Sequence, residues 1–379
     1  MNKRHTHFLS ARGASALTAA TLVLLALGSP RARADYDETT TKSFDVKAGG
    51  KLVILADRGS IQVAPGQSDK VEVRIVRKVE KAKEKEAKDL LAKHELSFKQ
   101  DGREVVVQAK ADKGISTWGM NSPRLQVSYY ITVPSQFDLD LKTSAGSVHV
   151  GDQQGQVSLQ TAGGSLHTGA IQGDLTGKTS AGSIHVGSVS GRTDVQTAGG
   201  SIEIKAATKD VLAVTSAGSI SVEKADGKVY ARTSGGGIRL GDIAGSIKAD
   251  TAAGSIAIRH AKSDVRARTA GGGIEVESAE GAVEASTSAG GIQVGFAKSP
   301  SNDCKLETAG GAIVVRVPEG FSADLDAAVV GGKVHSDLPV QASTGEPQRG
   351  KLAGKLGTGG KQLRLRTSAG SIQLVKSQT

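Results

Sequence analysis

Three histidines and a glutamate recur with an 18-residue period, at His149, His167, His185 and Glu203. Imidazole nitrogens and carboxylate oxygens are zinc ligands at about 2.0–2.2 Å. If consecutive 18-residue segments stack as strands about 4.8 Å apart, the four side chains are spread over about 14 Å and cannot converge on one ion. The spacing therefore favours an outward-facing ladder, which we expect to form a contact face without a bound metal.

Serines stand two residues before each of these histidines, at Ser147, Ser165 and Ser183. A serine beside a histidine is part of a hydrolytic triad, but a triad also needs a carboxylate that orients the histidine and an oxyanion pocket. Nothing in the sequence places either one. We expect the three serines to belong to the same contact face as the histidines, and we identify no catalytic residue.

Three further features have the residue types of a reactive or cofactor site without the required pattern. Residues 173–179 read G-D-L-T-G-K-T, which is one residue short of a phosphate-binding loop and precedes a strand-like segment instead of a helix. The tandem T-A-G-G phrases lack the aspartate of calcium-binding nonapeptide repeats. Cys304 falls at an inward position of the repeat, which predicts a small buried side chain. We expect no cofactor.

Carbohydrate-active enzymes also use β-helices, so this class needs a separate argument. Their sites require acids and bases clustered on loops that project from one face. The aspartates of this chain are instead dispersed, at Asp152, Asp174, Asp194 and Asp210, and the first insertion into the repeat lies at residues 298–303. We therefore expect a protein that is not an enzyme.

The element that must position all of these residues is an 18-residue repeat. Nine threonines follow one another at this spacing without a break: Thr143, Thr161, Thr179, Thr197, Thr215, Thr233, Thr251, Thr269 and Thr287. A glycine follows each of them by three residues: Gly146, Gly164, Gly182, Gly200, Gly218, Gly236, Gly254, Gly272 and Gly290. The same glycine recurs outside this array at Gly59, Gly311, Gly332 and Gly370. Such regularity is the signature of a repeat architecture.

The repeated glycine indicates a corner of the backbone, where either φ is positive or another backbone runs too close for a Cβ atom. Apolar and polar residues alternate after it, as in Ile184 and Val186, and again before the next threonine, as in Val211 and Ala213. This alternation is typical of a half-buried strand. Two short strands cannot bury an apolar edge alone, so we expect an all-β fold in which the repeats stack as coils of a parallel β-solenoid.

Two kinds of solenoid have coils of this length. The handedness rule for parallel crossovers favours a right-handed β-helix. Left-handed hexapeptide helices also have 18-residue coils, but they need an aliphatic residue at every sixth position. The sixth and twelfth residues after Ile184 are Ser190 and Gln196. The right-handed form is therefore the first interpretation and the left-handed form the second.

The expected solenoid, residues 143–337, is flanked by segments of different texture. Residues 35–142 predict a strand-rich region with strands at Leu52–Leu55, Val71–Val76, Val105–Gln108 and Leu125–Val133. One helix is predicted near 79–91, where Glu84 precedes Lys88 by four residues. Exposed strand edges aggregate, so we expect this region to cap the solenoid. Residues 338–379 are expected to hold the other cap and the last coil.

The N-terminal segment, residues 1–34, differs from the rest of the chain. It combines basic residues, an apolar run from Ala14 to Leu27 and the small-residue pattern Ala32-Arg33-Ala34 before Asp35. This pattern is typical of a cleaved secretory signal, and the run is shorter than the about 20 residues that span a bilayer. We expect export to the periplasm, cell envelope or exterior of a bacterial cell, with no transmembrane span in the mature chain. The segment holds five of the 48 basic residues and no acidic one, so the net charge of +10 is a weak argument for nucleic-acid binding.

The chain resembles the bacterial putative-adhesin family. The resemblance is carried by the transition I-T-V-P-S-Q-F-D-L-D-L-K-T-S-A-G-S-V-H-V at residues 131–150, the stacked T-S-A-G-S-I phrases and the closing G-K-L-G-T-G-G-K-Q-L-R-L-R-T-S-A-G-S-I-Q-L at residues 354–374. It covers nearly the whole mature chain. The resemblance implies a β-solenoid that is adhesin-like by architecture, and it brings no catalytic residues with it.

These observations leave three functions in order. We expect a non-enzymatic, monomeric solenoid that presents an extended surface to an unidentified envelope protein or glycan. The alternative is an envelope structural or signalling module that recognises one protein partner. A carbohydrate-active β-helix enzyme comes last. No nucleic-acid partner is expected.

Overall fold

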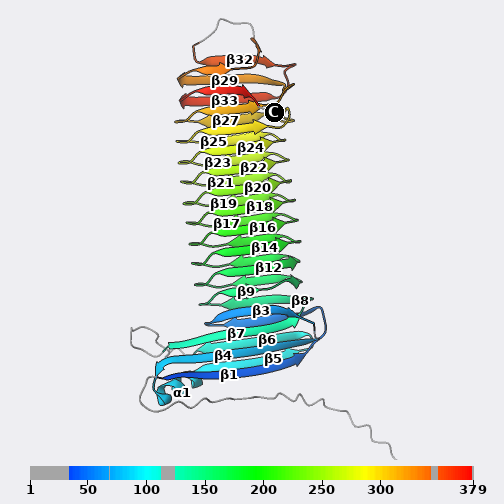
Figure 1. Cartoon of the computed structure of the whole chain (residues 1–379), viewed down its shortest axis with the longest axis vertical. Coiled ribbons are helices and arrows are strands. Elements are labelled where there is room, and N and C mark those ends of the chain that lie inside the picture. The colour runs from blue at the N-terminus through cyan, green and yellow to red at the C-terminus, as the bar shows by residue number, and fades with distance from the viewer. Residues whose placement is uncertain (1–33, 68, 112–123, 343–348, 378–379) are drawn as a thin grey trace, which may run out of the picture.

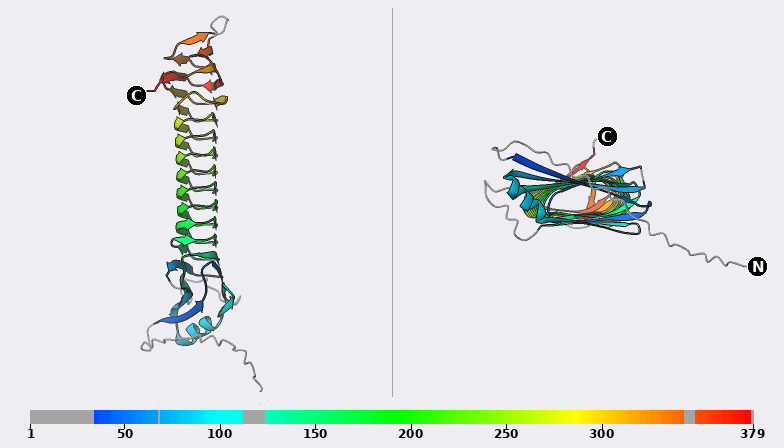
Figure 2. Two further views of the ribbon diagram at one scale, coloured as in Figure 1. Left: turned by 90° about the vertical axis from the view of Figure 1, so that its right-hand side faces the viewer. Right: turned by 90° about the horizontal axis from the view of Figure 1, so that it is seen from below.

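The computed structural model describes residues 34–67, 69–111, 124–342 and 349–377, so residues 1–33 of the expected export signal lie outside it. These residues form a long rod built from two β-sheets that face each other (Figure 1). Seen from the side, the sheets are two layers along the same axis (Figure 2). The one helix of the described residues is α1 (Glu84–Ala92). No described helix is both long and apolar enough to cross a membrane.

Each coil of the regular array contributes one strand to each sheet, except that the first coil contributes the two short strands β9 and β10 to sheet I. Sheet I contains β9 (Val148–Val150), β10 (Gln153–Gln154), β12 (Leu166–Gln172), β14 (Ile184–Val189), β16 (Ile202–Ala207), β18 (Ile220–Ala225), β20 (Ile238–Ile243), β22 (Ile256–Ala261), β24 (Ile274–Ala279), β26 (Ile292–Phe296) and β28 (Ile313–Val317). Sheet II contains β8 (Phe137–Thr143), β11 (Val157–Gln160), β13 (Leu175–Lys178), β15 (Thr193–Gln196), β17 (Val211–Val214), β19 (Val229–Arg232), β21 (Ile247–Asp250), β23 (Val265–Arg268), β25 (Val283–Thr287) and β27 (Cys304–Thr308).

Neighbouring coils pair in parallel and in register. His167 lies opposite His185 across β12 and β14, and Val211 lies opposite Val229 across β17 and β19. Both offsets equal the 18-residue sequence repeat. The prediction of a parallel β-solenoid with 18-residue coils is therefore confirmed.

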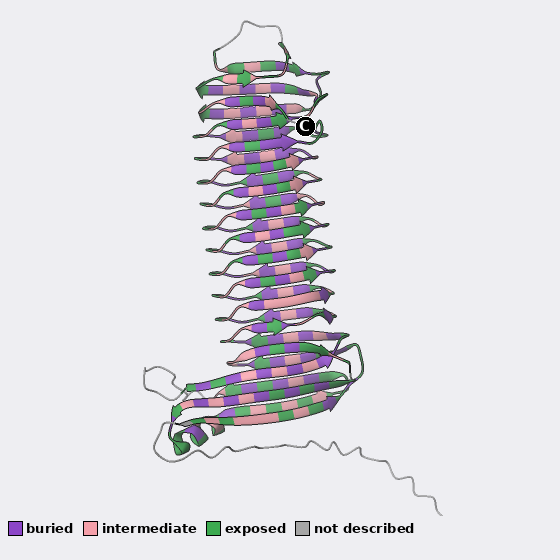
Figure 3. Ribbon diagram, viewed as in Figure 1, coloured by how far each residue is buried: buried purple, intermediate pink, exposed green. Residues whose placement is uncertain are grey.

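The alternating residues of the two sheets form one continuous core. In sheet I, Ile184, Ile202 and Ile220 occupy the same inward position of successive coils and are each 1% exposed. Val211 and Ala213 face them from sheet II and are also buried. Figure 3 shows this alternation as repeated buried bands along most strands of the rod. Because parallel strands bond to the coil on each side, the same apolar positions stack along the whole rod.

The corner glycines of the array are required by close backbone approach. A Cβ atom on Gly200 would overlap the carbonyl oxygen of Gly182 in the preceding coil. Of the repeated glycines, only Gly59, Gly146 and Gly370 have φ in the left-handed region, at 106°, 126° and 147°. The sequence left two explanations open for the repeated glycine. Close approach of another backbone is confirmed throughout the array, whereas a positive φ occurs in the array only at Gly146, in its first coil.

The repeated threonine connects consecutive coils. Thr215 is buried, and its hydroxyl donates to the carbonyl oxygen of Gly200 at 2.8 Å and accepts from the backbone N–H of Gly218 at 3.4 Å. The same donated bond recurs from Thr161 to Thr287. Each threonine thus satisfies two backbone groups at a corner, where no strand partner is available.

Several dispersed aspartates have a comparable role at the opposite corner. Asp174 accepts the backbone N–H of Arg192 at 2.8 Å, and Asp210 accepts that of Lys228 at 2.9 Å. In both pairs the donor lies one repeat later, in the next coil. These carboxylates therefore hold the coils together.

At the N-terminal end, the order of coils in space differs from the order in sequence. This end adds β1 (Ala34–Asp45), β4 (Lys70–Ala82), β7 (Arg124–Pro134) and β3 (Ser60–Gly66) to sheet I, and β5 (His94–Asp101), β6 (Glu104–Ala111) and β2 (Gly50–Ala56) to sheet II. The coil β2–β3 lies between β6–β7 on one side and β8–β9 on the other. Beyond it, β1, β4 and β7 pair antiparallel, as do β5 and β6.

The strands and the helix predicted for this end are all present, and only the start of the helix differs from the prediction. The four predicted strands correspond to β2, β4, β6 and β7. The helix begins at Glu84 and not at Val79, because residues 79–82 continue β4 and bury Val79 and Ala82. The predicted Glu84–Lys88 pair forms at 2.8 Å.

At the C-terminal end, too, the order of coils in space differs from their order in sequence. It adds β34 (Ile372–Lys376) and β30 (Val334–Ser336) to sheet I, and β33 (Gln362–Ala369), β29 (Ala323–Gly331), β32 (Lys351–Leu356) and β31 (Val340–Ala342) to sheet II. The last coil in sequence, β33–β34, lies between β27–β28 and β29–β30. The antiparallel strands β32 and β31 complete sheet II. The last coil is thus an internal layer of the rod.

Candidate functional site

The expected histidine ladder lies on the outer face of sheet I. His149, His167 and His185 come from β9, β12 and β14, and their rings follow one another in a row, with the rings of His167 and His185 stacked. The ring centroids of His149 and His167 are 5.9 Å apart, and those of His167 and His185 are 4.8 Å apart with nearly parallel planes. His185 Nε2 lies 3.8 Å from Glu203 Oε2. The structure therefore brings the four predicted residues together in one row.

The electrostatics of this row favour a neutral imidazole at His167. Partial burial lowers the pKa of His167, and the neighbouring His185 and His149 lower it further. The rings lie side by side and do not converge on a common point, and among the described residues no group of three histidine, cysteine or acidic side chains is placed to hold a metal ion.

The three predicted serines take part in bonds between coils. Ser147 Oγ accepts the backbone N–H of Ser165, and Ser165 Oγ accepts that of Ser183, both at 3.2 Å. Ser183 Oγ likewise accepts the backbone N–H of Ser201. All three serines are half-buried. Their hydroxyls thus belong to the scaffold beside the histidine row.

Cys304 lies where the repeat predicted it. It is 2% exposed and points into the core from β27. Burial raises the pKa of its thiol to about 11, so the thiolate form is strongly disfavoured. The prediction of a small buried side chain is confirmed.

The row on sheet I continues past Glu203 into a hollow of about 460 Å³. Small side chains form its base, at Ser221 and Ala257, and Arg239 projects between them from β20. The outward position that holds three histidines thus changes coil by coil to glutamate, serine, arginine and alanine.

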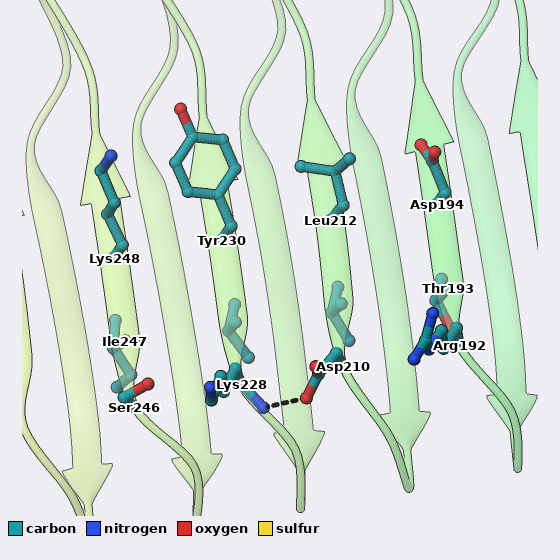
Figure 4. A pocket seen from close by; sticks show the side chains of 12 residues that line it. Arg192, Thr193, Asp194, Asp210, Leu212, Lys228, Tyr230, Ser246, Ile247 and Lys248 are labelled. Carbon is teal, nitrogen blue, oxygen red and sulfur yellow. Dashed lines mark hydrogen bonds between the residues drawn. The ribbon is translucent and has the colours of Figure 1, made fainter.

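The sequence did not identify a second surface, a groove on the outer face of sheet II that we call the axial groove (Figure 4). It has a volume of about 400 Å³ and crosses four coils. Two rows of side chains line it: Asp194, Leu212, Tyr230 and Lys248 in one row, and Arg192, Asp210, Lys228 and Ser246 in the other.

The alternation of the strands creates this groove. Between the two rows lie Thr193, Val211, Val229 and Ile247, whose side chains point into the core, so that their backbone forms the floor of the groove. Successive side chains of a strand point to opposite faces, so this gap repeats from coil to coil. The result is a channel parallel to the rod axis and perpendicular to the strands.

Apolar and charged groups face one another in the axial groove. Tyr230 is half-buried, and the Lys248 ammonium lies 5.0 Å from the centroid of its ring. Leu212 lies one coil away in the same row. The guanidinium of Arg192 and the ammonium of Lys228 are exposed, and neither forms a hydrogen bond or ion pair with a described side chain. They stand on either side of Asp210 (Figure 4).

One signal in the sequence marks this groove. Tyr230 is the only phenylalanine, tyrosine or tryptophan between residues 143 and 295, and it falls at an outward position of the repeat. The same position holds Ser158 and Thr176 in earlier coils. A large ring at an outward position, with Leu212 in the preceding coil, is unusual for a solvated face.

Several known proteins are similar to this chain. No curated protein matches it. Among solved structures, a putative cell adhesion protein from Clostridium sporogenes is 10% identical with a TM-score of 0.20, over 89% of this chain and 100% of that chain. A putative adhesin from Bacteroides fragilis is 10% identical with a TM-score of 0.23, over 89% and 97%. A putative lipid binding protein from Parabacteroides distasonis is 14% identical with a TM-score of 0.21, over 89% and 96%.

The family model for Toastrack DUF4097 matches the chain twice, over residues 50–270 and 193–375. The two matches overlap within the regular array and together reach into both ends. The chain belongs to the Toastrack DUF4097 family.

Proposed function

We propose that this protein is an exported, non-enzymatic β-solenoid that binds a component of the cell envelope or exterior through the outer faces of its rod. In this proposal the array, residues 143–337, carries the binding surface, and residues 35–142 and 338–379 close its ends. The protein acts as a monomer and in the manner of an adhesin.

The observation that carries the proposal is the contrast between inward and outward positions of the same strands. From β9 to β28, the inward position at the start of each coil's strand in sheet I is Val148, Leu166 and then isoleucine in eight consecutive coils. The adjacent outward position changes from histidine to glutamate, serine, arginine and alanine. A regular core with a varied outer face supports a scaffold whose surface is available for recognition.

The scaffold also accounts for polar groups that could otherwise indicate catalysis. The threonine hydroxyls, the serine hydroxyls beside the histidines and the carboxylates of Asp174 and Asp210 all bond to backbone groups of the neighbouring coil. This engagement favours a binding role over a hydrolytic one. The alternative, a module that recognises a single protein partner, uses the same surfaces.

Export and binding are tested by separate experiments. Mass spectrometry of the exported protein should find an N-terminus near Asp35, and an intact N-terminus on that protein would contradict export by a cleaved signal. The purified protein should retain envelope material on a column, and a glycan array should separate the two forms of the proposal. Binding to glycans favours the adhesin-like role, while crosslinking to one envelope protein favours the alternative. If neither glycans nor envelope components bind, the proposed function is wrong.

A further inference from the structure

We propose that the axial groove binds an acidic oligosaccharide segment that lies along the rod axis. This inference rests on the proposed binding function and names the site and the class of ligand. It is carried by three properties of the groove: its direction, the tyrosine in one wall and the unpaired cations in the other.

The direction and size of the groove fit a linear polymer. It crosses the strands at β15, β17, β19 and β21, which span about 14 Å at the usual strand spacing. Its volume of about 400 Å³ lies within the range of small-molecule sites. A pyranose unit is close in length to one coil spacing, so consecutive sugars can contact consecutive coils.

Tyr230 provides a surface for a sugar ring. Its ring is half-buried on the outer face and lies between Leu212 and Lys248 of the neighbouring coils. The C–H groups on one face of a pyranose are apolar and carry a partial positive charge, which suits the electron-rich face of an aromatic ring. The Lys248 ammonium beside the ring can donate hydrogen bonds to sugar oxygens at the same time.

The opposite wall favours a carboxylate-bearing sugar. Arg192 and Lys228 project from alternate coils of this wall without a side-chain partner among the described residues, and Lys248 adds a third cation across the groove. Guanidinium and ammonium groups form strong charge-assisted hydrogen bonds with carboxylates. Asp194 and Asp210 remain available as acceptors for sugar hydroxyls, because the carboxylate of each accepts only one hydrogen bond from the described residues.

The floor argues against an extended peptide as the occupant. Peptides add to sheets through free backbone groups at an edge. Here the floor backbone is already paired between coils: the N–H groups of Thr193, Val211 and Val229 donate to carbonyl oxygens of the next coil at 3.0, 2.8 and 3.0 Å. Recognition in this groove must therefore come from the side chains of its walls.

The test is calorimetric titration of the purified protein with a short oligogalacturonate, and with a neutral oligogalactoside as the comparison probe. The wild type should bind the acidic probe at least about tenfold more tightly than the neutral one. Tyr230→Ala should weaken binding about tenfold, and Tyr230→Phe should retain it because the ring remains. The double variant Arg192→Gln with Lys228→Gln should remove the preference for the acidic probe.

Tyr130→Ala is the matched control. Tyr130 is a half-buried tyrosine on the outer face of sheet I, and the Arg74 guanidinium lies 4.2 Å from its ring centroid. This substitution should leave binding unchanged. All variants should keep the wild-type Tm, since each changed side chain lies on an outer face.

Two results would overturn the inference. One is wild-type protein that does not bind oligogalacturonate, and the other is binding that is equal in Tyr230→Ala and in wild type. The proposed function is tested separately, by the retention of envelope material on a column, and it fails if the wild-type protein retains none. If the Tyr230→Ala protein retains that material as wild type does, the proposed binding function is upheld. The axial groove is then not the site that binds the envelope material.

Discussion

The regular array and the two ends of the rod use the same coil in different ways. Between β12 and β26, each coil bonds to the coils that precede and follow it in sequence. At the ends, the chain places a coil between two others that are distant in sequence, as β33 lies between β27 and β29. Antiparallel strands then finish sheet II at each end.

This difference separates two physical requirements. In the array, stability is a sum of similar contacts between neighbours, and the repeat supplies them in every coil. At an end, the last coil would expose an unpaired edge that invites aggregation. At each end, a coil is inserted between two others and antiparallel strands cover the outer layer. The end is therefore held by contacts between residues far apart in sequence, so it cannot unfold one coil at a time.

Deletions should show the largest difference between the two regions. Removing residues 197–214 takes out one complete coil of the array and joins equivalent positions, so the rod should fold with one coil fewer and a similar Tm. Removing residues 362–379 takes β33–β34 from between β27–β28 and β29–β30 and should abolish the monomer. Size-exclusion chromatography and circular dichroism measure both. Equal solubility and Tm of the two deletions would contradict the role assigned to the inserted coil.

Substitution of two adjacent glycines tests the corner. Gly164→Ala should destabilise the fold by about 2 kcal/mol, because its Cβ would overlap the carbonyl oxygen of Gly146. Gly163→Ala is the control, since its Cβ would meet only ordinary contacts at 3.9 Å. Alanine already stands at the matching position in other coils, as Ala145 and Ala181 do. Urea denaturation measures both variants, and an equal loss of stability in the two would refute close approach as the cause.

The threonine bonds should contribute a smaller amount. Thr215→Val keeps the shape of the side chain but leaves the Gly200 carbonyl and the Gly218 N–H without this partner. The expected loss is about 1–2 kcal/mol, the usual effect of leaving buried polar groups unpaired. Ser216→Ala, at the exposed next position, should cost nothing measurable. If both variants unfold at the same urea concentration as wild type, the threonine is not a structural link.

The smallest effect is expected at the histidine row. The pKa of His167 is lowered in the folded protein, so the unfolded chain binds protons more readily and stability falls as pH drops below about 6.5. The variant His167→Gln should therefore lose less Tm between pH 7 and pH 5 than wild type. His335→Gln, at an exposed histidine near the C-terminal end, is the control. If the Tm of His167→Gln changes with pH as the wild-type Tm does, proton binding by His167 is not coupled to folding.

The array was predictable because the same physical demand returns in every repeat. Gly164 and Gly182 mark the same close approach, and Ile184 and Ile202 the same core position, so a single chain shows the pattern many times. The buried position of Cys304 followed from the same register.

The ends and the axial groove were not predictable in the same way. The placement of β33 between β27 and β29 depends on pairing between segments that share no fixed spacing. The groove depends on which outward side chains adjoin across four coils, and Tyr230 marks it only once the register is known. The histidine row was found because its spacing is itself a repeat, while the structural bonds of Ser147 and Ser165 required coordinates.

Pulsed electron paramagnetic resonance on spin-labelled pairs tests the stacking of coils most directly. Ser158, Lys248 and Glu284 occupy the same outward position of sheet II, and the last two lie five and seven coils beyond the first. Labels at 158 and 248 should be about 24 Å apart, and labels at 158 and 284 about 34 Å apart. An increase of about 10 Å between the two pairs supports coils in register. Equal distances, or an order that is reversed, would contradict the solenoid and every surface assigned from it.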